Sequence, residues 1–165
     1  MSLIINGKKL KKVDTVKFMG VLIDENLSWE PQIEHIKQKL NASIIVIKRI
    51  RKFIPESEYM KLYDALFKSH LSYCISCWGG ISNYKLATIF SLQKRCVRLL
   101  FGTAPTYDHA SYYETCARVR TYEENVTKEY SLEHTKPLFA NQNILTLHHL
   151  YIQHTFIELF KIYYY

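Results

Sequence analysis

Hydrophobic residues recur with a helical period along much of the chain. Residues 29–53 are predicted to form the first long helix, because apolar positions return there every three, four or seven residues. We expect Ser28 to cap its N-terminus, and Pro55 to end it and to start the next helix. The apolar positions are Ile33, Ile36, Leu40, Ile44, Ile47 and Ile54. The pattern predicts an amphipathic helix with one buried face.

The same period predicts three further helices. The second lies between Pro55 and Gly79-Gly80, the third covers 83–101 with Gly102 just past its end, and the last covers 145–163. Between them, 103–136 is rich in Tyr, Thr and Glu, with a helix expected near 109–120. The expected buried stripe of the second helix is Tyr59, Leu62, Tyr63, Leu66, His70, Tyr73, Cys74 and Cys77; that of the third is Leu86, Ile89, Phe90, Val97 and Leu100.

The first 24 residues carry β signals instead. Leu3–Ile5 is a strand candidate, and Asn6-Gly7 is the dipeptide that best fits a type I′ turn. The apolar run 16–23 is predicted as one further strand, in which Gly20 marks a bulge or a close approach by another backbone. The predicted fold class is therefore mainly α, with an N-terminal β hairpin, a helical bundle and a C-terminal helical segment. Such short strands are marginal alone, so we expect their sheet partners to lie outside this chain.

Charge is unevenly distributed along the 165 residues. Residues 1–105 hold 17 Lys and Arg against 8 Asp and Glu, whereas residues 106–165 hold 5 against 7. A basic first part favours a polyanionic partner, although a merely soluble basic surface gives the same count. No signal peptide is evident, and the longest apolar run, Ile44–Ile47, is far too short for a membrane span. Four Cys without a secretory signal then point to an intracellular, reducing compartment with free thiols.

Two basic clusters follow from helical geometry. Four basic residues of the first helix fall within an arc of about 100°, and three residues of the third helix are neighbours at spacings of three and four. We expect both clusters to face one polyphosphate track, although positive charge near a helix C-terminus is also favoured by the helix dipole. The predicted nucleic-acid-binding residues are Lys37, Lys48, Arg51, Lys52, Lys94, Arg95 and Arg98.

No catalytic or metal centre is expected in this chain. Zinc needs four converging ligands, but the Cys74–Cys77 pair has no second close pair and is expected to lie in a buried helical stripe. Two-metal phosphoryl transfer needs clustered carboxylates, and the Asp residues are isolated from one another. Phosphate-binding Gly-rich loops and nucleophile elbows are also missing. The four Asp are Asp14, Asp24, Asp64 and Asp108.

The order of short motifs resembles the end of the reverse transcriptase domain of LINE-type (non-LTR) retrotransposons, with the jockey-like elements most similar. Each motif is short, but the ordered series covers nearly the whole chain. The motifs are Val16–Asp24, Leu27–Trp29, His35-Ile36 with Lys39, Arg49 with Arg51, Ile54-Pro55, Leu62-Tyr63, His70–Cys74, Trp78-Gly79, Leu92–Arg98, Pro137–Phe139 and Asn143–Leu145.

This resemblance implies a division of the chain and a role for each part. Residues 1–27 would be the end of the palm, in which Phe18, Met19 and Gly20 match the primer grip that steadies the primer end. Residues 28–102 would be the thumb that closes over an RNA–DNA hybrid, and 103–165 a linker with a C-terminal helix. The family's Tyr-x-Asp-Asp metal site and its fingers lie upstream, so magnesium is expected only in the missing palm and no cofactor in this chain.

The expected function is thus that of a non-catalytic thumb fragment of an RNA-directed DNA polymerase. Its partners would be RNA–DNA hybrid or duplex, together with the missing palm and fingers, in the nucleus or cytoplasm as part of a retrotransposon ribonucleoprotein and away from membranes. Two other interpretations stay open. The chain could be a helical protein-interaction module, or the nonfunctional product of a truncated genomic copy.

Overall fold

The structure, a computed structural model, describes residues 4–6, 8–9, 12–102 and 135–164. Within these ranges the chain is mainly α with short β hairpins at the N-terminal side, which confirms the predicted fold class. The helix expected near 109–120 lies outside the described residues, as does Cys116.

The first hairpin is built as the sequence predicts. Strands β1 (Ile4–Ile5) and β2 (Lys8–Lys9) pair antiparallel, with Ile5 opposite Lys8. The connection between them is therefore the Asn6-Gly7 pair. Asn6 has φ 49°, in the left-handed region that a type I′ turn requires.

The prediction of a single strand over residues 16–23 is wrong. Strand β3 (Thr15–Phe18) turns back on β4 (Val21–Asp24), and Phe18 pairs with Val21. Met19 and Gly20 connect the strands with φ 45° and 82°, so both central residues of this turn have positive φ. A Met at the first turn position gives no turn signal, and the apolar run therefore reads as continuous.

Helix α1 (Glu30–Ile50) begins with a different cap from the one expected. The carboxylate of Asp24 accepts hydrogen bonds from the backbone N–H groups of Ser28 and Trp29, both at 2.9 Å. Trp29, with φ 62°, occupies the N-cap position in place of Ser28. The end of β4 thus fixes the start of α1, since one carboxylate serves both elements.

The predicted second helix is divided into shorter pieces. A 3₁₀ turn η1 (Glu56–Glu58) leads into α2 (Tyr59–Tyr63), the π turn η2 (Asp64–Lys68), α3 (Ser69–Ser72) and α4 (Ile75–Trp78). Cys74, with φ 49°, breaks the helix between α3 and α4. From α2 to the first residue of α4 the fully buried side chains follow a spacing of four, which the wider π turn accommodates. These are Tyr63, Phe67, Leu71 and Ile75, of which only Tyr63 belongs to the predicted stripe.

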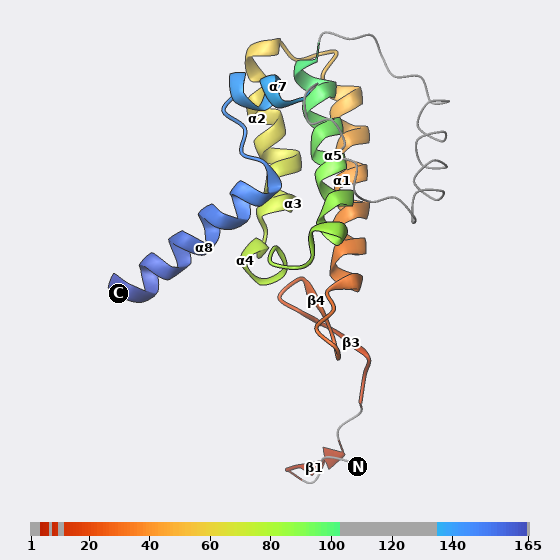
Figure 1. Ribbon diagram of the computed structural model, residues 1–165. Coiled ribbons are helices and arrows are strands. Elements are labelled where there is room, and N and C mark those ends of the chain that lie inside the picture. Colours follow the sequence, from red (N-terminus) through yellow and green to blue (C-terminus); the bar gives the residue numbers. More distant parts are fainter. Residues whose placement is uncertain (1–3, 7, 10–11, 103–134, 165) are drawn as a thin grey trace.

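The remaining helices are α5 (Asn83–Phe101), α7 (Lys136–Asn141) and α8 (Leu147–Tyr164). The bounds of α5 agree with the prediction, and Gly102 is its C-cap. In Figure 1, α1 and α5 run side by side in the same direction, and the segment from α2 to α3 runs the opposite way beside them. No helix in the described ranges has both the length and the apolar character that crossing a bilayer needs.

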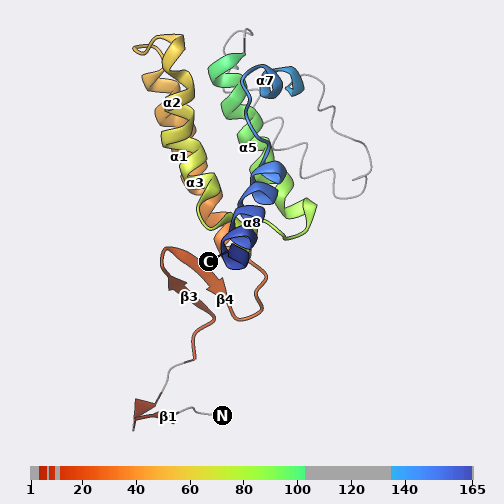
Figure 2. The ribbon, with the colours of Figure 1, turned by 90° about the vertical axis from the view of Figure 1, so that its left-hand side faces the viewer.

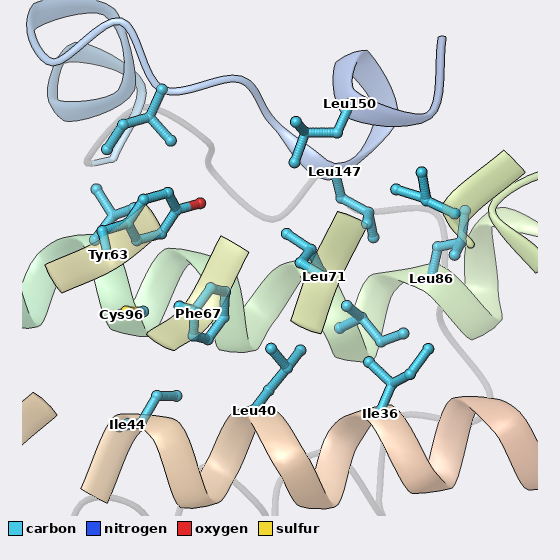
Figure 3. Packing of buried hydrophobic residues seen from close by; sticks show 14 of the residues in the cluster. Ile36, Leu40, Ile44, Tyr63, Phe67, Leu71, Leu86, Cys96, Leu147 and Leu150 are labelled. Carbon is cyan, nitrogen blue, oxygen red and sulfur yellow. The ribbon is translucent and has the colours of Figure 1, made fainter. Parts of the chain in front are cut away.

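The core forms where α1, the α2–α3 segment, α5 and the start of α8 meet (Figure 3). Gln93 of α5 is fully buried and holds these parts in register. Its amide nitrogen donates to Tyr63 Oη at 3.0 Å and to the Leu145 carbonyl at 2.8 Å, and its Oε1 accepts from the Leu147 N–H at 2.8 Å. Because every hydrogen bond goes to a fixed partner, Gln93 sets how α5 is rotated about its axis.

Candidate nucleic-acid interface

Basic residues gather at the C-terminal end of α1. Lys48 and Lys52 are exposed and Arg51 is half-buried. Within the described ranges none of the three pairs with an acidic side chain. Arg49, which the predicted arc leaves out, lies exposed between them, and we call these four residues the α1 basic end. The last-turn carbonyls of α1 favour this charge, because the C-terminal end of a helix carries a partial negative charge.

The N-terminal half of α1 is electrostatically different. Lys37, also predicted to bind nucleic acid, pairs with Glu34 at 2.7 Å. Glu30 pairs across to Lys85 of α5 at 2.8 Å, and Lys85 also donates to the Ser28 carbonyl at 3.2 Å. Positive charge along this side of α1 is therefore compensated near its start and uncompensated at its end.

The Glu30–Lys85 pair shows which side of α1 faces α5. Lys48 follows Glu30 by eighteen residues, which is about five full turns at about 3.6 residues per turn, so it projects from the same side of α1. Lys37 lies seven residues after Glu30, about two turns on. Lys37 and Lys48 therefore border the seam between α1 and α5.

The predicted basic residues of α5 lie elsewhere. Lys94 follows Lys85 by nine residues, which turns it by about 180°, to the flank of α5 away from α1. Its ammonium stands 4.9 Å from the centre of the Phe90 ring, and Phe90 contacts Phe139 of α7 with ring centres 6.1 Å apart. The Lys94 flank therefore faces α7.

Arg98 shares the flank of Lys94, and Arg95 lies between the two flanks on the outer side of α5. Burial lowers the pKa of Lys94, and the nearby Arg98 guanidinium lowers it further. The structure thus groups Lys94 with Arg98 but does not join them to the α1 basic end. The expectation that both clusters line one track is not met.

The primer-grip-like residues form the tip of the β3–β4 hairpin. Phe18 and Met19 are 59% and 75% exposed, which leaves both side chains available for contact. The tip is held from the helical body, because Tyr73 Oη donates to the Met19 carbonyl at 2.6 Å. A Cβ on Gly20 would meet the Tyr73 side chain at 3.7 Å, an ordinary contact. Gly20 is therefore required by its positive φ rather than by a close approach.

A second hydrogen bond ties the hairpin to α1. The Leu22 N–H donates to Oε1 of Gln32 at 2.9 Å, and Val21 beside it is buried. In Figures 1 and 2 the hairpin accordingly lies at the N-terminal end of α1. Its exposed tip and the α1 basic end are therefore at opposite ends of the same helix.

The cysteine pair is not in a buried stripe, contrary to the prediction. Cys74 lies at the helix break and is half-buried, and Cys77 is exposed. Burial, and then the neighbouring Cys77, raise the pKa of the Cys74 thiol. Cys96 is buried in the core, which raises its pKa to about 12. In the part of the chain that the structure describes, no three His, Cys, Asp or Glu side chains are grouped as metal ligands.

The described aspartates serve structural roles or stand alone. Asp24 caps the start of α1, and Asp64 pairs with Lys68 at 3.2 Å. Asp14 is exposed, at the start of β3. Among the described residues these three aspartates do not converge on one site.

Sequence reasoning missed three features of this interface. Arg49 fell outside the chosen arc, although a basic residue in the last turn of a helix is itself a signal. Phe53 follows the α1 basic end and is 87% exposed, which no periodicity indicates. The Tyr73 bond to the hairpin tip joins residues 54 positions apart and could be found only from the fold.

Comparison with known proteins gives no match to this chain. No family model, curated protein or solved structure matches it. The resemblance of its motifs to retrotransposon reverse transcriptases therefore stays an expectation from the sequence. The chain's own side chains must carry the functional proposal.

Proposed function

We propose that the chain binds RNA–DNA hybrid or duplex nucleic acid through phosphate contacts made by the α1 basic end. In this proposal it acts as the thumb of a retrotransposon RNA-directed DNA polymerase, and the bond-making carboxylates are supplied from outside the chain. The observation that carries it is the group of four cations, Lys48, Arg49, Arg51 and Lys52, that pair with no acid among the described residues.

Two physical arguments support this assignment. Cations without a protein counter-charge can neutralise phosphates, and each phosphate that they neutralise releases condensed counterions from the nucleic acid. The same cations lie on the last turn of α1 or just after it, and the opposite face of α1 is fully buried at Leu40 and Ile47, so the backbone that carries them is held in place before binding. Contacts of this kind read the backbone rather than the bases, and we expect little sequence preference.

Salt dependence of binding tests the proposal. The full chain is titrated onto a labelled RNA–DNA hybrid, and the dissociation constant is followed by fluorescence anisotropy at several KCl concentrations. With about three to four phosphates neutralised, log K should fall against log salt with a slope of about −3. A binding constant that does not change with salt, or no binding even at low salt, would contradict the proposal.

A protein-interaction module is the second candidate, because the outer half of α8 is apolar and exposed. In Figure 1 this half extends away from the bundle. Phe156, Phe160 and Tyr163 are 67%, 58% and 81% exposed. Such a surface is more typical of a protein contact than of a phosphate contact.

One variant with two substitutions separates the two candidates. Phe156→Ser with Phe160→Ser should leave hybrid affinity unchanged if the α1 basic end is the binding surface. Loss of hybrid binding in this variant, with its circular dichroism spectrum intact, would move the nucleic-acid contact to α8. Salt-independent association that the same variant abolishes would favour the interaction module.

A further inference from the structure

A second group of basic side chains meets where the hairpin packs on the helices. It is assembled from three elements and consists of Lys17 of β3, His35 and Lys39 of α1, and His70 of α3. Burial lowers the pKa of His35, and the neighbouring Lys39, Lys17 and His70 lower it further. We call these four residues the hairpin corner.

Three acids of β4 and α1, the elements beside the hairpin corner, already have partners of their own. Glu34 pairs with Lys37, Glu30 pairs with Lys85, and Asp24 accepts the N–H groups at the start of α1. Within the described part of the chain, neither Lys17 nor Lys39 pairs with a carboxylate. Like charges are thus brought together without a counter-charge from the protein.

His35 adds a polar atom without a partner. Its Nε2 is buried and makes no hydrogen bond, and it is alone in this among the buried side-chain nitrogens and oxygens of the described residues. Buried polar atoms are nearly always paired, and an exception often marks the place of an ion or a water. Unpaired imidazole and uncompensated ammonium groups in one corner both indicate an anion.

The hairpin corner is separate from the α1 basic end. Lys39 precedes Lys48 by nine residues, which places the two on opposite flanks of α1 at about 180°. The corner instead adjoins the hairpin tip, which Tyr73 of the neighbouring segment holds through the Met19 carbonyl. The phosphates that contact the α1 basic end therefore cannot be the ones that occupy the hairpin corner.

We propose that the hairpin corner binds a phosphate of a nucleic-acid backbone, with Lys17, Lys39 and His70 facing the phosphate and His35 gaining a proton when the corner is filled. This inference rests on the proposed function for its ligand. An anion among these groups offsets the repulsion that, together with burial, lowers the pKa of His35, so occupancy raises the proton affinity of its imidazole. By linkage, phosphate binds more tightly as the pH falls and His35 takes up its proton.

Imidazole titration tests the corner itself. The ring protons of His35 and His70 are assigned from His35→Gln and His70→Gln and followed by NMR against pH. Three conditions of equal ionic strength are compared: chloride, inorganic phosphate and the RNA–DNA hybrid. We expect the pKa of the His35 imidazole to rise with the hybrid. A rise with inorganic phosphate alone would overturn the nucleic-acid assignment, and no rise in either condition would overturn the site.

Hybrid affinity at two pH values gives the second test. Wild-type binding should be about threefold tighter, or more, near pH 6 than near pH 8, because a proton is taken up. Lys17→Ala with Lys39→Ala should remove this ratio. Lys61→Ala with Lys68→Ala, which deletes two lysines that pair with Glu58 and Asp64, is the matched control and should keep it.

The two proposals fail in different ways. Lys48→Glu with Arg51→Glu should weaken hybrid binding at both pH values but leave the ratio between them. If the wild-type chain binds no hybrid at any pH, the proposed function fails. The titration with inorganic phosphate then still tests whether the hairpin corner binds an anion. If the hybrid binds with the same affinity at both pH values, the proposed function stands and the proposal for the hairpin corner is contradicted.

Discussion

The basic end of α1 and the Lys94 flank of α5 look equivalent in the sequence but differ in their surroundings. The first carries four cations that meet no acid and no aromatic ring among the described residues. In the second, Lys94 is half-buried over Phe90 and crowded by Arg98. Helical spacing shows which cations share a flank, but the flank's neighbours decide whether that charge is available to a ligand.

The largest effect is expected on stability, at Gln93, which sets the rotation of α5. Gln93→Leu leaves the Leu147 N–H, the Leu145 carbonyl and the Tyr63 hydroxyl without their partner, which should lower the free energy of unfolding by about 3 kcal/mol. Urea denaturation measures it, with the exposed Gln38→Leu as control. Equal stability of the two variants would mean that Gln93 does not fix α5, and the separation of the flanks would lose its basis.

Charge reversal on each flank tests the comparison directly. Lys48→Glu with Arg51→Glu should weaken binding to the RNA–DNA hybrid roughly 10- to 50-fold at low salt, because two phosphate contacts become repulsive. Lys94→Glu with Arg98→Glu should weaken it by less than about threefold, through long-range charge alone. Helicity by circular dichroism should be unchanged in both. The reverse order of effects would place the nucleic acid against α5 and α7.

The smallest effect is expected on the pKa of Lys94. Arg98→Gln removes one of the two causes that lower the Lys94 pKa, so this pKa should rise toward its ordinary value. Burial remains, so recovery should be partial. NMR titration of the Lys94 side chain measures the change, with Arg49→Gln as the control that removes a distant cation. An unchanged Lys94 pKa would show that the two side chains of this flank do not interact.

Periodicity predicts the long elements well and the breaks poorly. The bounds of α5 follow from its apolar pattern and from Gly102, since both signals lie within the helix or next to it. The turn at Met19, the helix break at Cys74 and the π turn at 64–68 have no signal in the local apolar pattern, and the first of them is held by Tyr73, 54 positions away. The short helix α7 was missed, although Pro137 at its start is a helix signal.

The candidate site divides in the same way. Lys48, Arg51 and Lys52 could be grouped from one helix alone, because their relative placement needs only the helical repeat. Joining them to Lys94 needed the rotation of a second helix, which Gln93 sets through residues more than fifty positions away in the chain. The hairpin corner could not be predicted from the sequence for the same reason, because Lys17, His35 and His70 come from three different elements.

The most direct test of the central claim is to map the hybrid on the chain by NMR. Backbone amide shifts are recorded while the RNA–DNA hybrid is added to the full chain at low salt. The largest changes are predicted at Lys48–Lys52, with only small changes at Lys94–Arg98. Changes confined to Lys94–Arg98 or to the outer half of α8, or no changes at all, would contradict the claim that the α1 basic end holds the phosphate backbone.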